Sequence, residues 1–274
     1  MEAKDVYEAN FGKQIAFVYP HLTQTLSLTA NECALSCAHC NRQYLKGMYT
    51  LSDIDVNARS ILLSGGCDLN GRVPLKENFE LIRELSSKTK LIAHTGLVKK
   101  EDIEKIAPYL VSVSYNFIGD NSTIKEVYGL KKDVNDYIES YLTLKQFVKV
   151  YPHITIGIHG GKIRGEKYVL SILESLGTDA IVFNVFIPTP NTPYCDKEPP
   201  KIEEALKIIK GARLDFPNTP IFLGCMRPRG IYKRLLDEQV VGIVNRIVLP
   251  ASSAITKVQE LNYDVKKFEE CCIL

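Results

Sequence analysis

Short runs rich in β-branched residues alternate along the chain with longer segments of helical periodicity. This alternation is typical of repeated strand–helix units around a parallel sheet. Strands are predicted at 23–28, 60–64, 90–94, 111–115, 154–159, 180–187, 221–225 and 246–249. Helices are predicted at 76–87, 100–110, 133–150, 166–176, 201–216 and 231–241. The count predicts an α/β fold, a complete (β/α)8 TIM-type barrel formed by one domain.

The predicted barrel occupies residues 1–255, including a short N-terminal extension, and is followed by a C-terminal helix and a cysteine-containing tail at 256–274. A barrel of this kind carries its chemistry on the loops after the C-terminal ends of the strands, an end that we call the mouth. Polar, glycine and cysteine residues gather at those predicted positions, among them Ser64, Gly65, Gly66, Cys67, His94, Ser114, Asn116, His159, Gly160, Asn184 and Cys225. The mouth is therefore the expected active site.

Three cysteines on one loop, Cys33, Cys37 and Cys40, directly follow the first predicted strand. Three thiolates on one tight loop are suited to hold three irons of a cubane 4Fe–4S cluster and to leave the fourth iron open to a substrate or cofactor. Structural zinc is the main alternative, but it prefers four ligands in two separated pairs, and His39 lies inside the loop. A disulfide is a weaker alternative, because three crowded thiols leave one unpaired.

Composition limits the classes of partner. The chain has 274 residues, 45% of them hydrophobic, and a net charge of +2 with acids and bases mixed along its length. Because no basic block is present, nucleic acid is not the expected partner. No run of about eighteen apolar residues is present, so no membrane association is expected. Eight cysteines without a secretion signal favour a reducing, cytoplasmic location in which thiols stay free for metal.

The CxxxCxxC spacing of Cys33, Cys37 and Cys40 after a first strand resembles the motif of the radical S-adenosylmethionine (SAM) superfamily. The resemblance implies a 4Fe–4S cluster whose open iron binds SAM. It also implies reductive cleavage of SAM to a 5′-deoxyadenosyl radical, which abstracts hydrogen from a substrate. A low-potential electron donor, ferredoxin or flavodoxin, is the expected redox partner.

The same resemblance implies which residues bind SAM. Ser64, Gly65 and Gly66 stand where the family carries a Gly-Gly-Glu segment that receives the amino group of SAM, with Cys67 in place of the acid. His39 is expected near the adenine. The remaining expected contacts are Ser114 and Asn116 for the ribose or carboxylate, Gly157, His159 and Gly160 for the adenine, and Asn184. Each has a structural alternative, since paired glycines form ordinary turns and Ser or Asn side chains cap backbone groups. The resemblance assigns no residue a catalytic role.

The segment NVFIPTPNTP at 184–193 resembles an element of the biotin synthase-like subgroup, and this likeness covers roughly residues 20–255. Within that subgroup, the chain most resembles short archaeal proteins that act as subunits of a two-component lipoyl synthase. The implied activity is sulfur insertion, with a second radical SAM subunit as partner and a lipoyl-domain or small-molecule substrate.

Such enzymes take sulfur from a second iron–sulfur cluster, for which the candidate ligands are Cys67, Cys225, Cys271 and Cys272. Cys195 is also predicted at the mouth. The terminal pair Cys271 and Cys272 is expected either to fold back over the mouth or to form a disordered tail, and Cys225 has the alternative of a small buried hydrophobe. One of Arg227 and Arg229 is expected to face the mouth, where a guanidinium binds carboxylates.

Two other functions remain open. The first is a radical SAM mutase, lyase or methylation enzyme without an auxiliary cluster. The second is a non-catalytic protein of iron–sulfur assembly or electron transfer.

Overall fold

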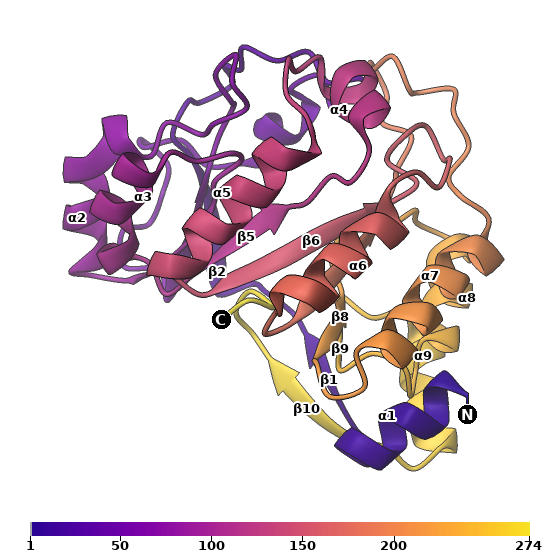
Figure 1. Cartoon of the computed structure of the whole chain (residues 1–274). Coiled ribbons are helices and arrows are strands. Elements are labelled where there is room, and N and C mark those ends of the chain that lie inside the picture. Colours follow the sequence, from indigo (N-terminus) through magenta and orange to yellow (C-terminus); the bar gives the residue numbers. More distant parts are fainter. Residues whose placement is uncertain (1) are drawn as a thin grey trace.

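The structure, a computed structural model, describes residues 2–274 and contains one sheet of ten parallel strands with helices on its outer face (Figure 1). The strands are β1 (Gln14–Val18), β2 (Thr23–Ser27), β3 (Ser60–Ser64), β4 (Lys90–His94), β5 (Ser112–Asn116), β6 (Val150–Ile156), β7 (Ile181–Val185), β8 (Ile221–Leu223), β9 (Arg246–Val248) and β10 (Asp264–Phe268). The α-helices are α1 (Ala3–Phe11), α2 (Phe79–Ser86), α3 (Lys100–Ile106), α4 (Asn121–Tyr128), α5 (Val134–Phe147), α6 (Glu166–Leu176), α7 (Ile202–Asp215), α8 (Ile231–Gln239) and α9 (Ser252–Glu260). Short 3₁₀ turns η1 (Gln43–Gly47), η2 (Lys76–Asn78) and η3 (Ala107–Tyr109) complete the elements.

The sheet curls but does not close. Its order is β10-β1-β9-β8-β7-β6-β5-β4-β3-β2, so among the described residues β2 and β10 are both edge strands. The prediction of a complete eight-stranded barrel is corrected to an open, curled sheet of ten strands. The chain end lies at this opening: the Leu22 N–H donates to the Glu269 carbonyl (3.0 Å), and the Cys271 N–H donates to Thr23 Oγ1 (2.8 Å).

Two strands are absent from the prediction, and only one of them has a weak sequence signal. β10 reads Asp-Val-Lys-Lys-Phe and is exposed along most of its length, so it lacks the apolar run expected of a parallel strand. β1 reads Gln-Ile-Ala-Phe-Val and is buried from Ile15 to Val18, so an apolar run typical of a strand lies within the predicted N-terminal extension. The helix predicted at 133–150 ends earlier, at Phe147, because Val148 and Val150 favour extended backbone and β6 begins at Val150.

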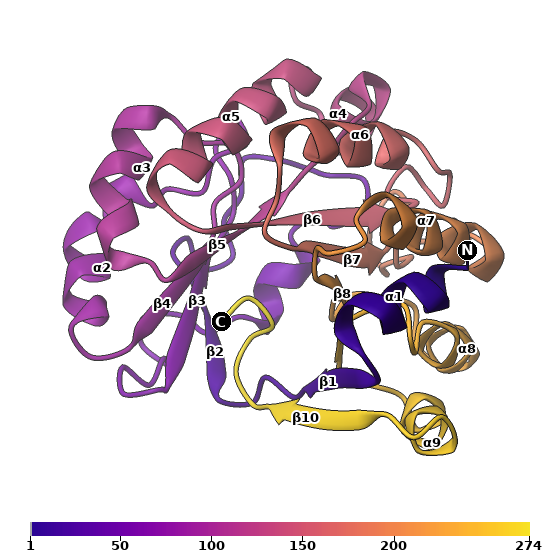
Figure 2. The same cartoon turned by 60° about the horizontal axis from the view of Figure 1, so that its bottom comes forward.

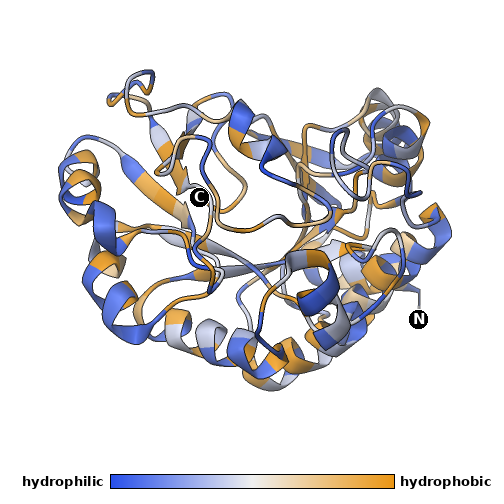
Figure 3. Ribbon diagram, turned by 90° about the horizontal axis from the view of Figure 1, so that it is seen from above, coloured by the Kyte–Doolittle hydropathy of each residue, from blue (hydrophilic) through white to orange (hydrophobic). Residues whose placement is uncertain are grey.

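Two hydrophobic cores pack against the sheet, and a third, small cluster lies beside the cysteine loop. The larger core lies between the sheet and the helices, which in Figure 3 show alternating hydrophobic and hydrophilic positions. The smaller core lies inside the curl, in the space that we call the lumen. It joins strand residues such as Val18, Ile92 and Phe222 to Cys272 and Ile273 of the chain end.

Residues 269–274, here called the tail, therefore close the lumen at the N-terminal ends of the strands (Figure 2). Ser112, the first residue of β5, donates its hydroxyl to the Ile273 carbonyl (2.7 Å). Glu270 pairs with Arg59 (3.2 Å) and Lys90 (3.3 Å), which lie at the beginnings of β3 and β4. The tail is thus ordered and is not folded over the mouth. It lies at the opposite end, because Ser112, Arg59 and Lys90, which bind it, are at the beginnings of their strands.

The predicted boundary between residues 255 and 256 falls inside α9, and β10 then extends the same sheet. Within residues 2–274, no helix combines the length and the apolar composition needed to cross a membrane.

Candidate functional site

The cysteine loop, residues 33–40, follows β2 at the mouth and is fixed by three separate parts of the fold. The Ala34 N–H donates to the Cys67 carbonyl after β3 (2.8 Å), and the Ala38 N–H donates to the Val127 carbonyl of α4 (2.7 Å). The Ala38 carbonyl accepts from the Tyr194 N–H (3.0 Å) in the loop after β7. Segments distant in sequence thus hold the backbone of the three cysteines in place.

A cavity of about 140 Å³ lies against this loop. All three loop cysteines, Cys33, Cys37 and Cys40, line it together with Cys67. Four of the ten residues expected to bind SAM also line it: His39, Gly65, Gly66 and Asn116. We call this space the cysteine cavity.

The backbone at Gly66 lies directly against the loop. A Cβ at this position would stand 1.9 Å from the Glu32 carbonyl oxygen and 2.6 Å from Cys33 Cβ, so any larger residue must displace main chain. The Gly66 N–H donates to Thr29 Oγ1 (2.7 Å). Glycine is required here because two backbone segments meet without room for a side chain.

The thiols of the cavity affect one another. Burial, together with the neighbouring thiols Cys40 and Cys33, raises the pKa of the Cys37 thiol to about 12. Burial and Cys33 likewise raise the pKa of the Cys67 thiol to about 12. Without a cation the Cys37 and Cys67 thiols are therefore protonated at neutral pH, and a bound metal, by its charge, reverses this preference.

His39 has an unsatisfied polar atom. Burial lowers the pKa of His39 to about 4, so its imidazole is neutral at neutral pH. Its Nδ1 is buried and has no hydrogen-bond partner among the described residues. The rings of Tyr128 and Tyr44 lie 5.2 Å and 6.2 Å from it, centroid to centroid. A buried nitrogen of this kind is costly unless a ligand supplies its partner.

These residues fit a cubane cluster and an attached organic ligand. Within residues 2–274, no three Cys, His, Asp or Glu side chains surround one point as ligands of a single metal ion. A single zinc ion needs that arrangement, whereas a cubane accepts each thiolate at a different iron. The set of thiols and the unpaired His39 Nδ1 both suit the second case.

The other expected SAM contacts do not line the cysteine cavity. The Ser114 hydroxyl lies 3.2 Å from His94 Nδ1, and the Asn184 Oδ1 accepts from the Met226 N–H (3.3 Å). His159 contacts α4, with its Nδ1 3.1 Å from Thr123 Oγ1. The same strand end supports the loop, because Ile158 packs against Ala38.

Six of the ten residues expected to bind SAM therefore lie outside the cavity lining. The side chains of Ser114, His159 and Asn184 contact other protein groups, as described above. The other three residues are Ser64, Gly157 and Gly160, and the Gly157 N–H donates to Glu166 Oε1 (2.8 Å).

The four cysteines predicted for a second cluster fall into two groups. Cys67 lies in the cysteine cavity, whereas Cys271 and Cys272 lie in the tail. Cys225 follows β8; its residue surface is accessible, but its thiol is surrounded by protein, and this burial together with nearby Cys271 raises the pKa of the Cys225 thiol. Cys195 is exposed on the loop after β7.

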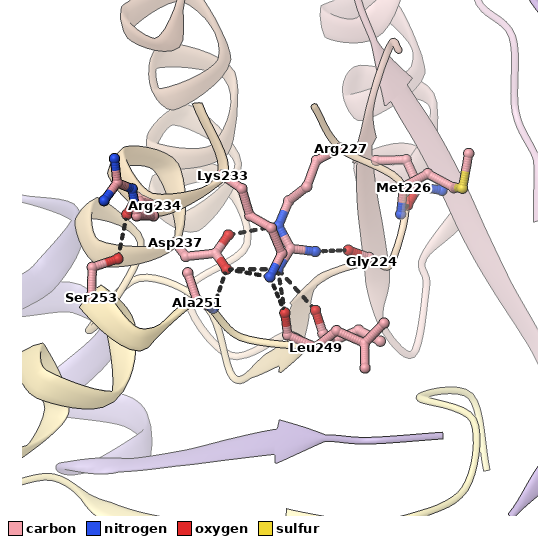
Figure 4. Close-up of polar contacts among 11 residues, drawn as sticks. Gly224, Met226, Arg227, Lys233, Arg234, Asp237, Leu249, Ala251 and Ser253 are labelled. Carbon is pink, nitrogen blue, oxygen red and sulfur yellow. Dashed lines mark hydrogen bonds and ion pairs between the residues drawn. The ribbon is translucent and has the colours of Figure 1, made fainter. Parts of the chain in front are cut away.

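Arg227 does not face the mouth as a free cation. It is 2% exposed, and it donates from Nε and Nη2 to the two Asp237 oxygens (2.6 and 2.7 Å) (Figure 4). Its Nη1 donates to the Gly224 carbonyl (2.6 Å), and Nη2 also donates to the Val248 carbonyl (2.8 Å). Arg229 is exposed. Of the two arginines of which one was expected to face the mouth, Arg227 is therefore not that one, because its donors hold β8, α8 and β9 together.

Arg42, Tyr128 and Tyr137 also line the cysteine cavity, although no motif in the sequence identifies them. Tyr128 ends α4, a helix that was not predicted, and Tyr137 lies on the buried side of α5. The sequence signal that could have indicated α4 is Asp120, because aspartate is a preferred N-cap residue. In the structure Asp120 does cap α4, where its carboxylate accepts the Thr123 N–H (2.8 Å).

Solved structures share this architecture at low sequence identity. Methylornithine synthase (PylB) superposes with a TM-score of 0.66 and 15% identity, over 96% of this chain and 87% of PylB. The FeFe-hydrogenase maturase HydG from Carboxydothermus hydrogenoformans superposes with a TM-score of 0.69 and 16% identity, over 90% of this chain and 61% of HydG. Streptococcus suis SuiB bound to S-adenosylmethionine superposes with a TM-score of 0.56 and 12% identity, over 78% of this chain and 52% of SuiB.

The chain shares their fold. It spans about three fifths of HydG and about half of SuiB. No family model matches the sequence, and no curated protein matches it.

Proposed function

We propose that this protein is a radical SAM enzyme that binds a 4Fe–4S cluster through Cys33, Cys37 and Cys40 and cleaves SAM reductively. The observation that carries the proposal is the cysteine cavity: three thiols of one loop share it with Gly65, Gly66 and Asn116. The fold supports it, because SuiB, which has the same fold, was solved with SAM bound.

The cluster, when bound, supplies the electron that splits SAM and so yields the radical. The chain's residues position the ligand and protect it. Gly66 lets the segment after β3 lie directly against the cysteine loop, and neutral His39 offers an unpaired Nδ1. The tail closes the far end of the lumen and keeps bulk water from a reactive radical.

The finer proposal is sulfur insertion at an unactivated carbon, as in a biotin or lipoyl synthase-like enzyme, with the protein as one subunit of a two-component lipoyl synthase. Its support is the group formed by Cys225, Cys271 and Cys272 in or beside the lumen, separate from the cysteine cavity. These three thiols are the candidate ligands of a sulfur-donating second cluster. A ferredoxin or flavodoxin would supply the electron, and a lipoyl-domain or small-molecule substrate would enter the lumen.

The test is anaerobic reconstitution with iron and sulfide, followed by incubation with SAM and dithionite. We expect the wild type to form 5′-deoxyadenosine and a Cys33/Cys37/Cys40→Ala variant to form none. Absence of 5′-deoxyadenosine from a cluster-loaded wild type would contradict the proposal and favour an assembly or electron-transfer protein.

Iron counts test the finer proposal. A wild type with two cubanes contains about eight irons, and about four remain in the Cys33/Cys37/Cys40→Ala variant and in a Cys225/Cys271/Cys272→Ala variant. About four irons in the wild type and none in the first variant would overturn sulfur insertion and favour mutase, lyase or methylation chemistry.

A further inference from the structure

Cys67 stands beside the three loop cysteines although it comes from a different strand–loop unit. It follows β3, and its thiol lines the same cavity as Cys33, Cys37 and Cys40. A cubane has four irons, so a loop with three cysteines leaves one iron without a protein ligand. The fold brings a fourth cysteine into the same cavity.

The segment that carries Cys67 cannot move away from the loop. The Cys67 N–H donates to Cys33 Sγ (3.2 Å), and the Cys67 carbonyl accepts from the Ala34 N–H (2.8 Å). Gly66 holds the preceding peptide against Cys33 so closely that a Cβ would overlap with it. The Cys67 backbone is therefore fixed beside the three loop cysteines, and its side chain is free to turn about its Cα–Cβ bond.

Neighbouring groups favour a thiolate over water at an open iron. Apolar and aromatic side chains such as Leu35, Leu97 and Tyr137 make up much of the cavity lining. Thiolate is a preferred ligand of iron in such surroundings. Asp68, next in the chain, is occupied by its own turn, where Oδ1 accepts the Asn70 and Arg72 N–H groups (2.8 and 2.9 Å).

We propose that Cys67 binds the fourth iron of the cluster when SAM is absent and that SAM displaces it. The inference rests on the proposed function. In this arrangement Cys67 protects the fourth iron from oxidative loss while SAM is absent. The step is a ligand exchange without change of oxidation state. The Cys67 thiol gives its proton to solvent as the iron–sulfur bond forms, and it takes a proton back when the amino and carboxylate groups of SAM replace it.

The direct test is Mössbauer spectroscopy of protein reconstituted with ⁵⁷Fe, without and with SAM, for the wild type, Cys67→Ala and Cys67→Ser. In the SAM-free wild type we expect all irons of this cluster to show sulfur coordination, and one of about four to change when SAM is added. In SAM-free Cys67→Ala that iron is already distinct. A distinct iron in the SAM-free wild type would overturn the proposal. The irons of any second cluster are removed beforehand by recording all spectra in a Cys225/Cys271/Cys272→Ala background.

Two further readouts separate this role from simple space filling. Mild oxidation should release the open iron from Cys67→Ala and produce the EPR signal of a 3Fe–4S cluster, while the wild type keeps its iron. The Kd for SAM should fall at least threefold in Cys67→Ala, because no thiolate has to be displaced. Equal iron loss and equal Kd in the wild type and Cys67→Ala would contradict the proposal.

Controls distinguish failure of this proposal from failure of the proposed function. Cys195→Ala removes an exposed cysteine outside the cavity and should behave as the wild type. If the Ala variant does not fold, Cys67→Ser retains the size and is read in its place. Loss of the cluster from Cys33/Cys37/Cys40→Ala, together with an unchanged spectrum in Cys67→Ala, would leave the proposed function intact and refute the fourth ligand.

Discussion

The cysteine cavity and the Arg227–Asp237 pair are both buried polar groups at the mouth, but they differ in how completely the protein satisfies them. All three guanidinium nitrogens of Arg227 donate to protein oxygens, and Asp237 Oδ2 also accepts the Ala251 N–H (2.8 Å). In the cysteine cavity, buried thiols raise one another's pKa, and His39 Nδ1 has no partner among the described residues.

The difference distinguishes a structural group from a ligand site. A buried ion pair with its hydrogen bonds complete has nothing left to offer a substrate, whatever its residue types suggest in the sequence. A buried polar group without a hydrogen-bond partner destabilises the folded protein, and a ligand that supplies the missing partner removes this penalty. The following changes test this contrast, beginning with the largest expected effect.

Cys37→Ala should greatly weaken binding of the cluster on the cysteine loop, because only two loop thiols then remain to bind irons. The free energy of unfolding of the apo protein should change by less than about 1.5 kcal/mol, since the thiol is incompletely buried and makes no ion pair. Iron analysis and urea unfolding measure the two quantities. Retention of the full iron content would show that the loop does not bind the cluster.

Asp237→Asn should lower the free energy of unfolding by about 3–5 kcal/mol, because Arg227 is left buried without its counter-charge. Iron bound per folded chain should stay unchanged. The double variant Arg227→Met/Asp237→Leu should be less destabilised than Asp237→Asn, since it removes both charges. Urea unfolding compares the three proteins, and a double variant that is the least stable of them would mean that the pair itself stabilises the fold.

Gly66→Ala should cost about 1–3 kcal/mol of unfolding free energy and slow cluster reconstitution, because the added methyl group forces Glu32 and Cys33 apart. Gly211→Ala is a matched control. Gly211 lies in α7 with nothing within 4 Å of an added Cβ, so this change should be neutral or should stabilise the protein by up to about 1 kcal/mol. Equal effects of the two substitutions would contradict the close contact between the Gly66 backbone and the cysteine loop.

His153→Asn should produce the smallest effect, a change in how stability depends on pH. Burial lowers the pKa of His153 from 6.5 to about 4, and its Nδ1–H donates to the Tyr151 carbonyl (2.9 Å). Between pH 6.5 and about pH 4, His153 is therefore protonated in the unfolded chain but neutral in the folded chain. Above pH 6.5 this difference does not affect the free energy of unfolding, and as the pH falls from 6.5 toward 4 it lowers that free energy.

Urea unfolding at several pH values measures this dependence. The variant should bind up to about one proton fewer on unfolding across this window than the wild type. His94, whose pKa is also lowered to about 4 by burial, keeps its own contribution in both proteins. An unchanged pH dependence would show that His153 is protonated in the folded protein.

Local pattern was enough to locate most of the sheet. The bounds of β3 and β4 match the prediction, because these strands are short apolar runs bounded by clear turns. Closure of the barrel was not predictable in this way, since it depends on β1, on the nearly fully exposed β10 and on where the tail binds. Tail placement is decided by partners distant in sequence, such as Lys90 and Ser112.

The candidate site was predicted to a similar degree. The spacing of Cys33, Cys37 and Cys40 identified the loop from the sequence alone. Neither the pairing of Arg227 with Asp237 nor the separation of Cys67 from the tail cysteines follows from spacing, because both arise from strand order and loop packing. A guanidinium next to a predicted strand end looks the same in sequence whether it is free or paired.

The central claim is that the cysteine loop holds a cluster to which SAM binds directly. The most direct measurement is the EPR spectrum of the dithionite-reduced, reconstituted protein recorded before and after addition of SAM, in the wild type and in the Cys33/Cys37/Cys40→Ala variant. We predict a cluster signal in the wild type that SAM changes, and no SAM-sensitive signal in the variant. A wild-type signal that is identical with and without SAM would contradict the account.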